Sequence, residues 1–229
     1  MRVDCVDMAA ALRRIESLVE DGGHHLVATV NPEFVMRARG DAEFARVLES
    51  ASLCLPDGSG VVWAARRQGC AMAGPVTGVD LIPPLAELCA RRGWRMFLLG
   101  APPGVAEELA ERLRAAHPGL AVDAAADDAK GELVRARRPH VLLVAFGAPK
   151  QEMWIDGVAR PAGVPVAMGV GGAFDYLTGR VPRAPAWMRR AGLEWSFRLV
   201  RQPWRWKRMA VLPVYAVRVL AQGRTPSHP

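Results

Sequence analysis

The chain has 229 residues, of which 51% are hydrophobic and 23% charged, and its net charge is +7. This length suits one large domain, or one domain with an appendage, and the composition excludes wholesale disorder. The charge is unevenly distributed, because residues 181–229 hold ten Lys or Arg against one acid, whereas residues 1–180 hold 20 basic and 22 acidic residues. Four of the seven tryptophans also lie in this tail. We therefore expect an almost neutral core at 1–182 and a basic, Trp-rich helical appendage at 183–229.

Apolar periodicity predicts helices and strands that alternate along most of the chain. In the first half of the chain we expect a helix at 4–20, a strand at 25–31, one helix that starts at 32, a second helix at 41–50, a strand at 53–55, one helix that ends at 67 and another at 79–92. In the second half we expect a strand at 95–99, a helix at 103–117, a strand at 120–122, a weak helix that ends at 138, and strands at 140–146 and 164–169. This order predicts an α/β fold with a mainly parallel sheet and helices on both faces. Two basic helices, at 185–201 and 203–221, are expected to follow.

The cysteines and the N-terminus bear on the cellular compartment. The four cysteines are widely separated and form no C-x-x-C pair: Cys5, Cys54, Cys70 and Cys89. This spacing favours buried thiols in a reducing compartment over disulfides or a metal site. The N-terminus has early acids and no basic-then-apolar signal segment, and no run of about 20 apolar residues occurs. We therefore expect a cytoplasmic protein without a membrane span.

Four predicted strands end in polar turns, at 29–31, 56–58, 146–152 and 169–175. The carboxyl ends of parallel strands gather at one edge of a sheet, where ligands bind. The polar residues of these four distant segments can therefore converge on one crevice. This arrangement favours an enzyme.

Asp57 is the strongest candidate catalytic residue, because a strand-end carboxylate beside Gly58 suits a general base. Its alternative is a helix N-cap or turn aspartate. Thr29 and Asn31 share one face of a strand and could bind a sugar or an acceptor. Their alternatives are a buried threonine and an asparagine that satisfies nearby backbone groups.

The glycine-rich turns differ in what they indicate. The turn that starts at Gly100 resembles a phosphate-binding strand–turn–helix, although an ordinary βα turn is the simpler interpretation. Three glycines at 169–172, followed by Asp175, favour close approach of a ligand to the backbone. Residues 127–128 are expected to form a solvated loop. No cluster has metal-ligand spacing, so no metal site is expected.

The basic tail has two interpretations. Arginines interleaved with tryptophans could bind single-stranded nucleic acid through phosphates and stacking. They could also lie on an anionic membrane. The segment 209–217 is apolar on nearly all sides, which fits lipid contact better.

Taken in order, these motifs resemble the WecG/TagA/CpsF family of bacterial glycosyltransferases. The matching pieces are Thr29-x-Asn31, Pro56-Asp57-Gly58-x-Gly60, Gly78-x-Asp80, Phe97-Leu98-Leu99-Gly100, Gly147-x-Pro149-x-Gln151-Glu152, Gly169-Val170-Gly171-Gly172-x-Phe174-Asp175, Arg183-Ala184-Pro185 and Leu193-Glu194-Trp195. The resemblance implies a Rossmann-like core and a glycosyltransferase that is metal-independent and inverting. Such an enzyme moves a sugar from a UDP-sugar to a polyprenyl-diphosphate-linked sugar at the inner face of the cytoplasmic membrane. The product would serve cell-surface polysaccharide or teichoic acid synthesis.

The resemblance also implies roles for individual residues. Asp57 corresponds to the proposed base, and Arg198, Arg205 and Arg208 match arginines thought to reach the donor diphosphate. The expected substrate-binding set is Thr29, Asn31, Gly100, Gln151, Gly171, Gly172 and Asp175. No cofactor and no nucleic acid are expected, and a homo-oligomer is possible. The alternatives are a nucleic-acid or anionic-lipid binding module with a nucleotide-binding core, and a soluble sugar-nucleotide enzyme, which the missing G-x-G-x-x-G motif disfavours.

Overall fold

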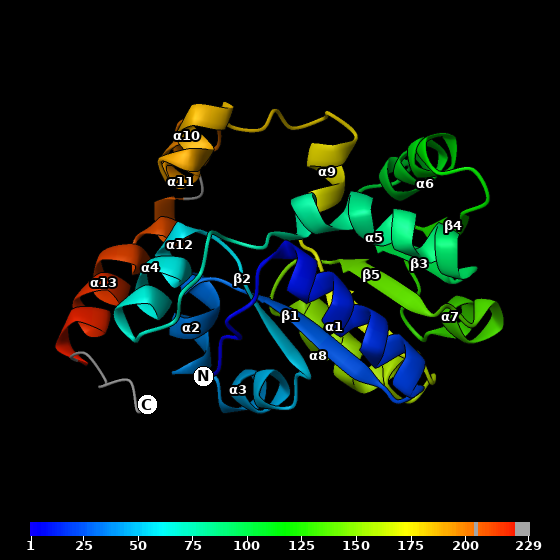
Figure 1. Ribbon diagram of the computed structural model, residues 1–229, viewed down its shortest axis with the longest axis horizontal. Coiled ribbons are helices and arrows are strands. Elements are labelled where there is room, and N and C mark those ends of the chain that lie inside the picture. The colour runs from blue at the N-terminus through cyan, green and yellow to red at the C-terminus, as the bar shows by residue number, and fades with distance from the viewer. Residues whose placement is uncertain (204–205, 223–229) are drawn as a thin grey trace.

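The computed structural model describes residues 1–203 and 206–222, in which six parallel strands form one sheet (Figure 1). The order across the sheet is β2-β1-β6-β5-β3-β4. The strands are β1 (His25–Val30), β2 (Leu53–Pro56), β3 (Arg95–Gly100), β4 (Ala121–Ala125), β5 (Val141–Ala145) and β6 (Val166–Gly169). The register pairs Thr29 with Leu55, and Gly100 with Ala145. The strand ends that the sequence separates therefore lie along one edge.

Helices cover both faces of this sheet, as the sequence predicted. One core lies under α1 (Met8–Asp21), α5 (Gly78–Arg92), α6 (Val105–Ala116) and α9 (Ala173–Leu177). The other lies under α2 (Pro32–Ala38), α3 (Ala42–Glu49), α7 (Glu132–Arg137), α8 (Lys150–Trp154) and the π-helical turn η1 (Ile155–Ala159). The alternation of apolar side chains along β1 divides them between these two cores. The α/β, Rossmann-like fold class is confirmed.

Capping side chains set several helix boundaries. Asp41 accepts a hydrogen bond from the backbone N–H of Phe44 at 3.0 Å and starts α3, as predicted. Asp7 caps α1, so this helix begins at Met8, four residues later than expected. The preceding segment is extended beside β2, because the Asp4 carboxylate accepts from the Cys54 N–H at 2.7 Å.

Asp128 corrects one expectation, because it is buried rather than part of a solvated loop. Its carboxylate accepts hydrogen bonds from the backbone N–H groups of Glu132 at 2.8 Å and Val134 at 2.9 Å. These are donors in the first turn of α7, which have no partner within the helix. The buried carboxylate therefore stabilises the start of a weak helix.

The C-terminal region contains four short helices in the described residues instead of the two expected. These are α10 (Ala186–Arg190), α11 (Glu194–Arg201), α12 (Trp206–Met209) and α13 (Val211–Ala221). Gly192, with φ of 73°, lies in the turn that separates α10 from α11. Tyr215 and Val219 of α13 are buried against Ala64 of α4 (Ser59–Arg67). The proposed division into 1–182 and 183–229 stays a prediction.

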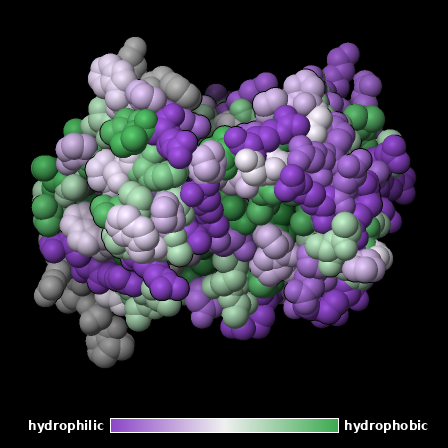
Figure 2. All heavy atoms as spheres, turned by 90° about the horizontal axis from the view of Figure 1, so that it is seen from above, coloured by the Kyte–Doolittle hydropathy of each residue, from purple (hydrophilic) through white to green (hydrophobic). Residues whose placement is uncertain are grey.

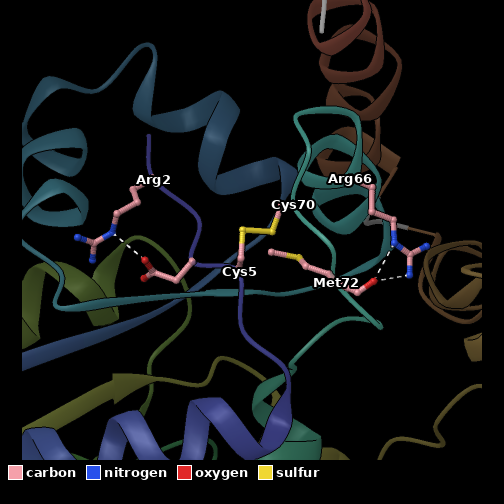
Figure 3. The surroundings of a disulfide bond; sticks show 6 residues. Arg2, Cys5, Arg66, Cys70 and Met72 are labelled. Atoms are coloured by element: carbon pink, nitrogen blue, oxygen red, sulfur yellow. Dashed lines mark hydrogen bonds and ion pairs between the residues drawn. A yellow bond between two sulfur atoms is a disulfide. The ribbon is translucent and has the colours of Figure 1, made fainter. Parts of the chain in front are cut away.

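Two of the four cysteines do not follow the sequence expectation. Cys5 and Cys70 form a disulfide with a Cα–Cα distance of 5.9 Å (Figure 3), whereas Cys54 and Cys89 are free and buried. The expectation was wrong for this pair because the contact joins the extended N-terminal segment to the loop after α4, across 65 positions of sequence. Arg66 holds the same loop by donating two hydrogen bonds to the Met72 carbonyl.

Loss of this cross-link should lower stability. Cys70→Ser is expected to reduce the free energy of unfolding under non-reducing conditions by about 2–4 kcal/mol, since a long loop in the unfolded chain is no longer closed. Denaturant titration measures this difference. After treatment with a thiol reductant, the wild type and the variant should unfold together. Recovery of four alkylatable thiols from the untreated, unfolded wild-type protein would contradict the cross-link.

Candidate active site

The candidate site lies at the carboxyl edge of the sheet, on the side where the C-terminal helices pack (Figure 1). Asp57 follows the last residue of β2, and its N–H donates to the Val30 carbonyl at 2.8 Å. Gly58 has φ of 94°, and a Cβ there would meet nothing within 4 Å. The start of α4 has no side-chain cap. Asp57 is therefore not the N-cap that was its alternative interpretation.

The environment of Asp57 makes its carboxyl group a weak acid. Burial is the main cause that raises its pKa, to about 6. Arg198 and a hydrogen bond from Asn31 lower the pKa, whereas Glu194 and Asp80 raise it. A carboxylate with a pKa close to neutrality is suited to take up a proton near physiological pH.

The candidates Thr29, on β1, and Asn31, which directly follows β1, have different contacts. The Asn31 side chain accepts from the Phe34 N–H at 3.1 Å and so caps α2, and its amide also lowers the pKa of Asp57. Thr29 is buried, and its hydroxyl donates to the Gly169 carbonyl at 3.0 Å. Asn31 thus lies near the candidate base, whereas Thr29 joins β1 to the end of β6.

Helix α11 brings a positive charge toward Asp57. The Arg198 guanidinium lies 4.8 Å above the centroid of the Tyr176 ring and pairs with Glu194 at 2.9 Å. Its Nε is buried and has no hydrogen-bond partner. Ser59, just after Asp57 and Gly58, donates to the Gly192 carbonyl at 3.0 Å, which fixes α11 beside the end of β2. The predicted Arg198 is therefore brought to Asp57.

An ion pair between Arg183 and Asp80 fastens the same region to the core. Two guanidinium nitrogens of Arg183 each lie 2.6 Å from a different Asp80 oxygen. Thr77 donates to Asp80 at 2.8 Å, and Arg189 approaches it at 4.0 Å. The sequence interpretation assigned no role to Asp80, Arg183 or Glu194, although all three occur in the motifs of the family resemblance.

Gln151 organises the glycine-rich ends of β5 and β6. It is buried, and its Oε1 accepts from the N–H groups of Gly147 and Gly171, each at 3.0 Å. Gly172 is exposed, and a Cβ there would lie 3.9 Å from an Asp175 oxygen. Burial raises the pKa of Asp175, and Arg180 lowers it. Gln151, Gly171, Gly172 and Asp175 thus belong to one connected edge.

Other predicted site residues are not joined to this cluster. Gly100 ends β3, which is separated from β6 by β5, and a Cβ there would lie 2.9 Å from the Phe146 ring. This packing and a φ of 99° both favour glycine here, and its role in substrate binding stays a prediction. Arg205 lies outside the described residues, and for Arg208 only the backbone in α12 is described.

The described residues also bear on a metal site, a membrane span and a cavity. These residues contain no group of three or more His, Cys, Asp or Glu that could hold a metal ion. No helix within 1–203 and 206–222 is long and apolar enough to cross a membrane. A cavity of about 440 Å³ lies at the amino end of β2 rather than beside Asp57, lined by Arg2, Asp4, Ser52, Leu53 and residues of α1.

The parallel α/β fold and a strand-end carboxylate beside arginines define an α/β enzyme. The family model described as "Glycosyl transferase WecG/TagA/CpsF family" matches residues 1–229. The chain therefore belongs to the WecG/TagA/CpsF family and is a glycosyltransferase.

Several relatives carry the same name, N-acetylglucosaminyldiphosphoundecaprenol N-acetyl-beta-D-mannosaminyltransferase. The protein of Bacillus subtilis (strain 168) is 34% identical over 206 residues, which cover 87% of this chain and 80% of that protein. The protein of Bacillus spizizenii is 34% identical over 209 residues, covering 89% and 81%. The protein of Staphylococcus aureus (strain MW2) is 28% identical over 205 residues, covering 86% and 80%.

Proposed function

We propose that this enzyme transfers N-acetylmannosamine, with inversion and without a metal ion, from its UDP derivative to N-acetylglucosaminyl-diphospho-undecaprenol. The names of the relatives support the identity of the sugar and of the acceptor. The family resemblance supports UDP as the leaving group and supports inversion. The observation that carries the chemistry is the partly buried Asp57 at the end of β2, whose pKa is lowered by the nearby Arg198 and Asn31 and raised to about 6 by burial.

Asp57 acts as the general base. It takes the proton of the acceptor hydroxyl as that oxygen attacks the anomeric carbon of the donor sugar. The bond between the anomeric carbon and the UDP oxygen breaks, and the leaving diphosphate takes the electron pair. A base with a pKa of about 6 is ionised at neutral pH and is still a stronger base than an exposed aspartate.

The leaving diphosphate gains negative charge, which arginines are suited to stabilise. Arg198 is the described arginine in the best position, because it already faces Asp57. Its pairing with Glu194 leaves its Nε free to donate to another acceptor. Arg205 and Arg208 belong to the same proposal through the family resemblance.

The enzyme meets its lipid-linked acceptor on the inner face of the cytoplasmic membrane as a peripheral protein. Eight of the eleven exposed large hydrophobic residues in the described part of the chain lie between residues 187 and 220. Figure 2 shows hydrophobic residues at the surface of the half that carries the C-terminal helices, whereas hydrophilic residues dominate the opposite half. Apolar side chains beside basic ones favour docking at a lipid interface.

A direct assay tests the proposal. The purified full chain is incubated with UDP-N-acetylmannosamine and a short-chain lipid-diphosphate-linked N-acetylglucosamine, and UDP release and disaccharide product are measured. Turnover should continue in EDTA. If the enzyme does not turn over this donor but does turn over another UDP-sugar, the proposed donor sugar would be rejected. Loss of turnover in EDTA that Mg²⁺ or Mn²⁺ restores would reject the metal-free mechanism. Salt-sensitive oligonucleotide binding without turnover would favour a binding module.

Replacement of the base should abolish most of the turnover. Asp57→Asn is expected to lower kcat by about 10²- to 10⁴-fold, the usual contribution of a general base, while UDP binding and the fold persist. Steady-state kinetics and calorimetric UDP binding measure these effects.

The pH profile provides an independent control on the base. Because Asp57 must be ionised to accept a proton, kcat/KM of the wild type should rise with pH and level off above about 6. The residual activity of Asp57→Asn should lack this step. Near-normal turnover by the variant would remove Asp57 from the mechanism.

Two arginines on α11 form a matched pair for the diphosphate contact. Arg198→Ala should weaken UDP binding and lower turnover by roughly 10- to 100-fold, since a charge-assisted contact is lost. Arg201→Ala should change both less than about threefold, because Arg201 is exposed and stacks on Phe197. Equal effects of the two substitutions would show that only the general positive charge of α11 matters.

The exposed apolar residues should determine membrane attachment. The double variant Trp187→Ser, Val200→Ser removes side chains that are 64% and 79% exposed, and it should weaken co-sedimentation with anionic liposomes by about tenfold or more. Leu133→Ser is the matched control, because Leu133 is also exposed but lies on α7, away from the C-terminal helices, and this variant should bind as the wild type does. Unchanged liposome binding by the double variant would reject this surface.

A further inference from the structure

A buried carboxyl group lies behind the glycine-rich edge of the site. Glu152, on α8, is 0% exposed, and its Oε1 accepts a hydrogen bond from the Gln151 Nε2 at 2.6 Å. Its other oxygen, Oε2, is buried and has no hydrogen-bond partner. A buried acid with a free oxygen costs free energy, so a functional reason for it is expected.

The backbone determines which way the Gln151 amide faces. Its Oε1 accepts from two N–H groups, those of Gly147 and Gly171. The Nε2 must therefore face the opposite way and needs an acceptor, since an amide NH₂ can only donate. Glu152 Oε1 supplies this acceptor, and a donor or an apolar group in its place would leave the buried Nε2 without a partner and so weaken the hold on the amide.

The end of β6 is packed directly against this pair. A Cβ on Gly169 would overlap both side chains, which leaves no room for either to move toward the strand. From the neighbouring strand, Thr29 donates to the Gly169 carbonyl at 3.0 Å. The network therefore connects β1, the turn after β5, helix α8 and the turn after β6.

Burial also favours the neutral form of Glu152. Desolvation is the main cause that raises its pKa, to about 7, and the Gln151 hydrogen bond lowers it. In the neutral form the proton resides on Oε2, and Oε1 remains an acceptor for Gln151. The acceptor oxygen, and not a negative charge, is then what Gln151 requires.

We propose that Glu152 is a positioning residue for the donor nucleotide. Its Oε1 holds the Gln151 amide, which in turn fixes the N–H groups of Gly147 and Gly171 and the course of the 169–172 turn. The effect on donor binding rests on the function proposed above, whereas the effect on the turn does not.

Three substitutions of Glu152 separate the acceptor oxygen from the charge. Glu152→Gln keeps an acceptor at the same reach and removes the acid. Glu152→Asp keeps the acid but withdraws it by one methylene, and Glu152→Leu removes the acceptor. UDP affinity, KM and kcat are measured for the full chain, together with hydrogen exchange of the Gly147 and Gly171 amides in the absence of ligand.

Glu152→Gln should stay within about threefold of the wild type in every measurement. Glu152→Asp and Glu152→Leu should speed amide hydrogen exchange at Gly171 by roughly tenfold, the factor that corresponds to one lost hydrogen bond. The Kd for UDP and the KM for the donor should rise by a similar factor. Because Glu152 does not touch the reacting atoms, kcat at saturating donor should change less than about threefold.

Two results would overturn the proposal. If Glu152→Gln were as damaging as Glu152→Asp, the charge would be essential and not the acceptor. If Glu152→Leu only lowered the melting temperature and left exchange at Gly171 unchanged, Glu152 would be purely structural. Should Glu152→Leu not fold, the comparison of Gln with Asp still decides. Wild-type protein that fails to bind UDP would reject the proposed donor, while the exchange data would still test the positioning.

Discussion

The ion pair between Asp80 and Arg183 joins the core to the C-terminal helices at the point where the candidate site is assembled. Both guanidinium contacts are 2.6 Å long, and such a bidentate pair fixes direction as well as distance. The pair lies next to the segment that leads into α10 and α11. The position of Arg198 relative to Asp57 therefore depends on this contact and on the Ser59–Gly192 hydrogen bond.

The second constraint is the shortage of space at the ends of β5 and β6. There one buried amide, that of Gln151, accepts hydrogen bonds from the N–H groups of two turns and so fixes the course of both. Turns that are already fixed lose little conformational freedom if a ligand binds. The polar contacts of Gln151 and the missing Cβ of Gly169 are thus two parts of the same device.

Local signals predicted most of the fold. Capping residues and helix breakers act over a few residues, and the helix start at 32, the start close to 41 and the end at 92 were found as expected. Contacts between distant segments were missed. Cys5 and Cys70 are 65 residues apart, and Arg183 and Asp80 are 103 apart, so no local pattern reveals them. The burial of Glu152 was also missed, because its neighbours in sequence resemble an ordinary polar turn.

The arrangement of the basic residues changes the meaning of the tail's charge. Counted along the sequence, all ten Lys and Arg of residues 181–229 add to the positive charge that would attract an anionic membrane. In the structure Arg183 is paired with Asp80 and Arg198 with Glu194, so these two charges are directed into the site. Each remaining basic residue near a membrane would contribute only about 1 kcal/mol. In the proposed attachment to a membrane, the exposed apolar residues of the same helices would therefore add to the contribution of the remaining basic residues.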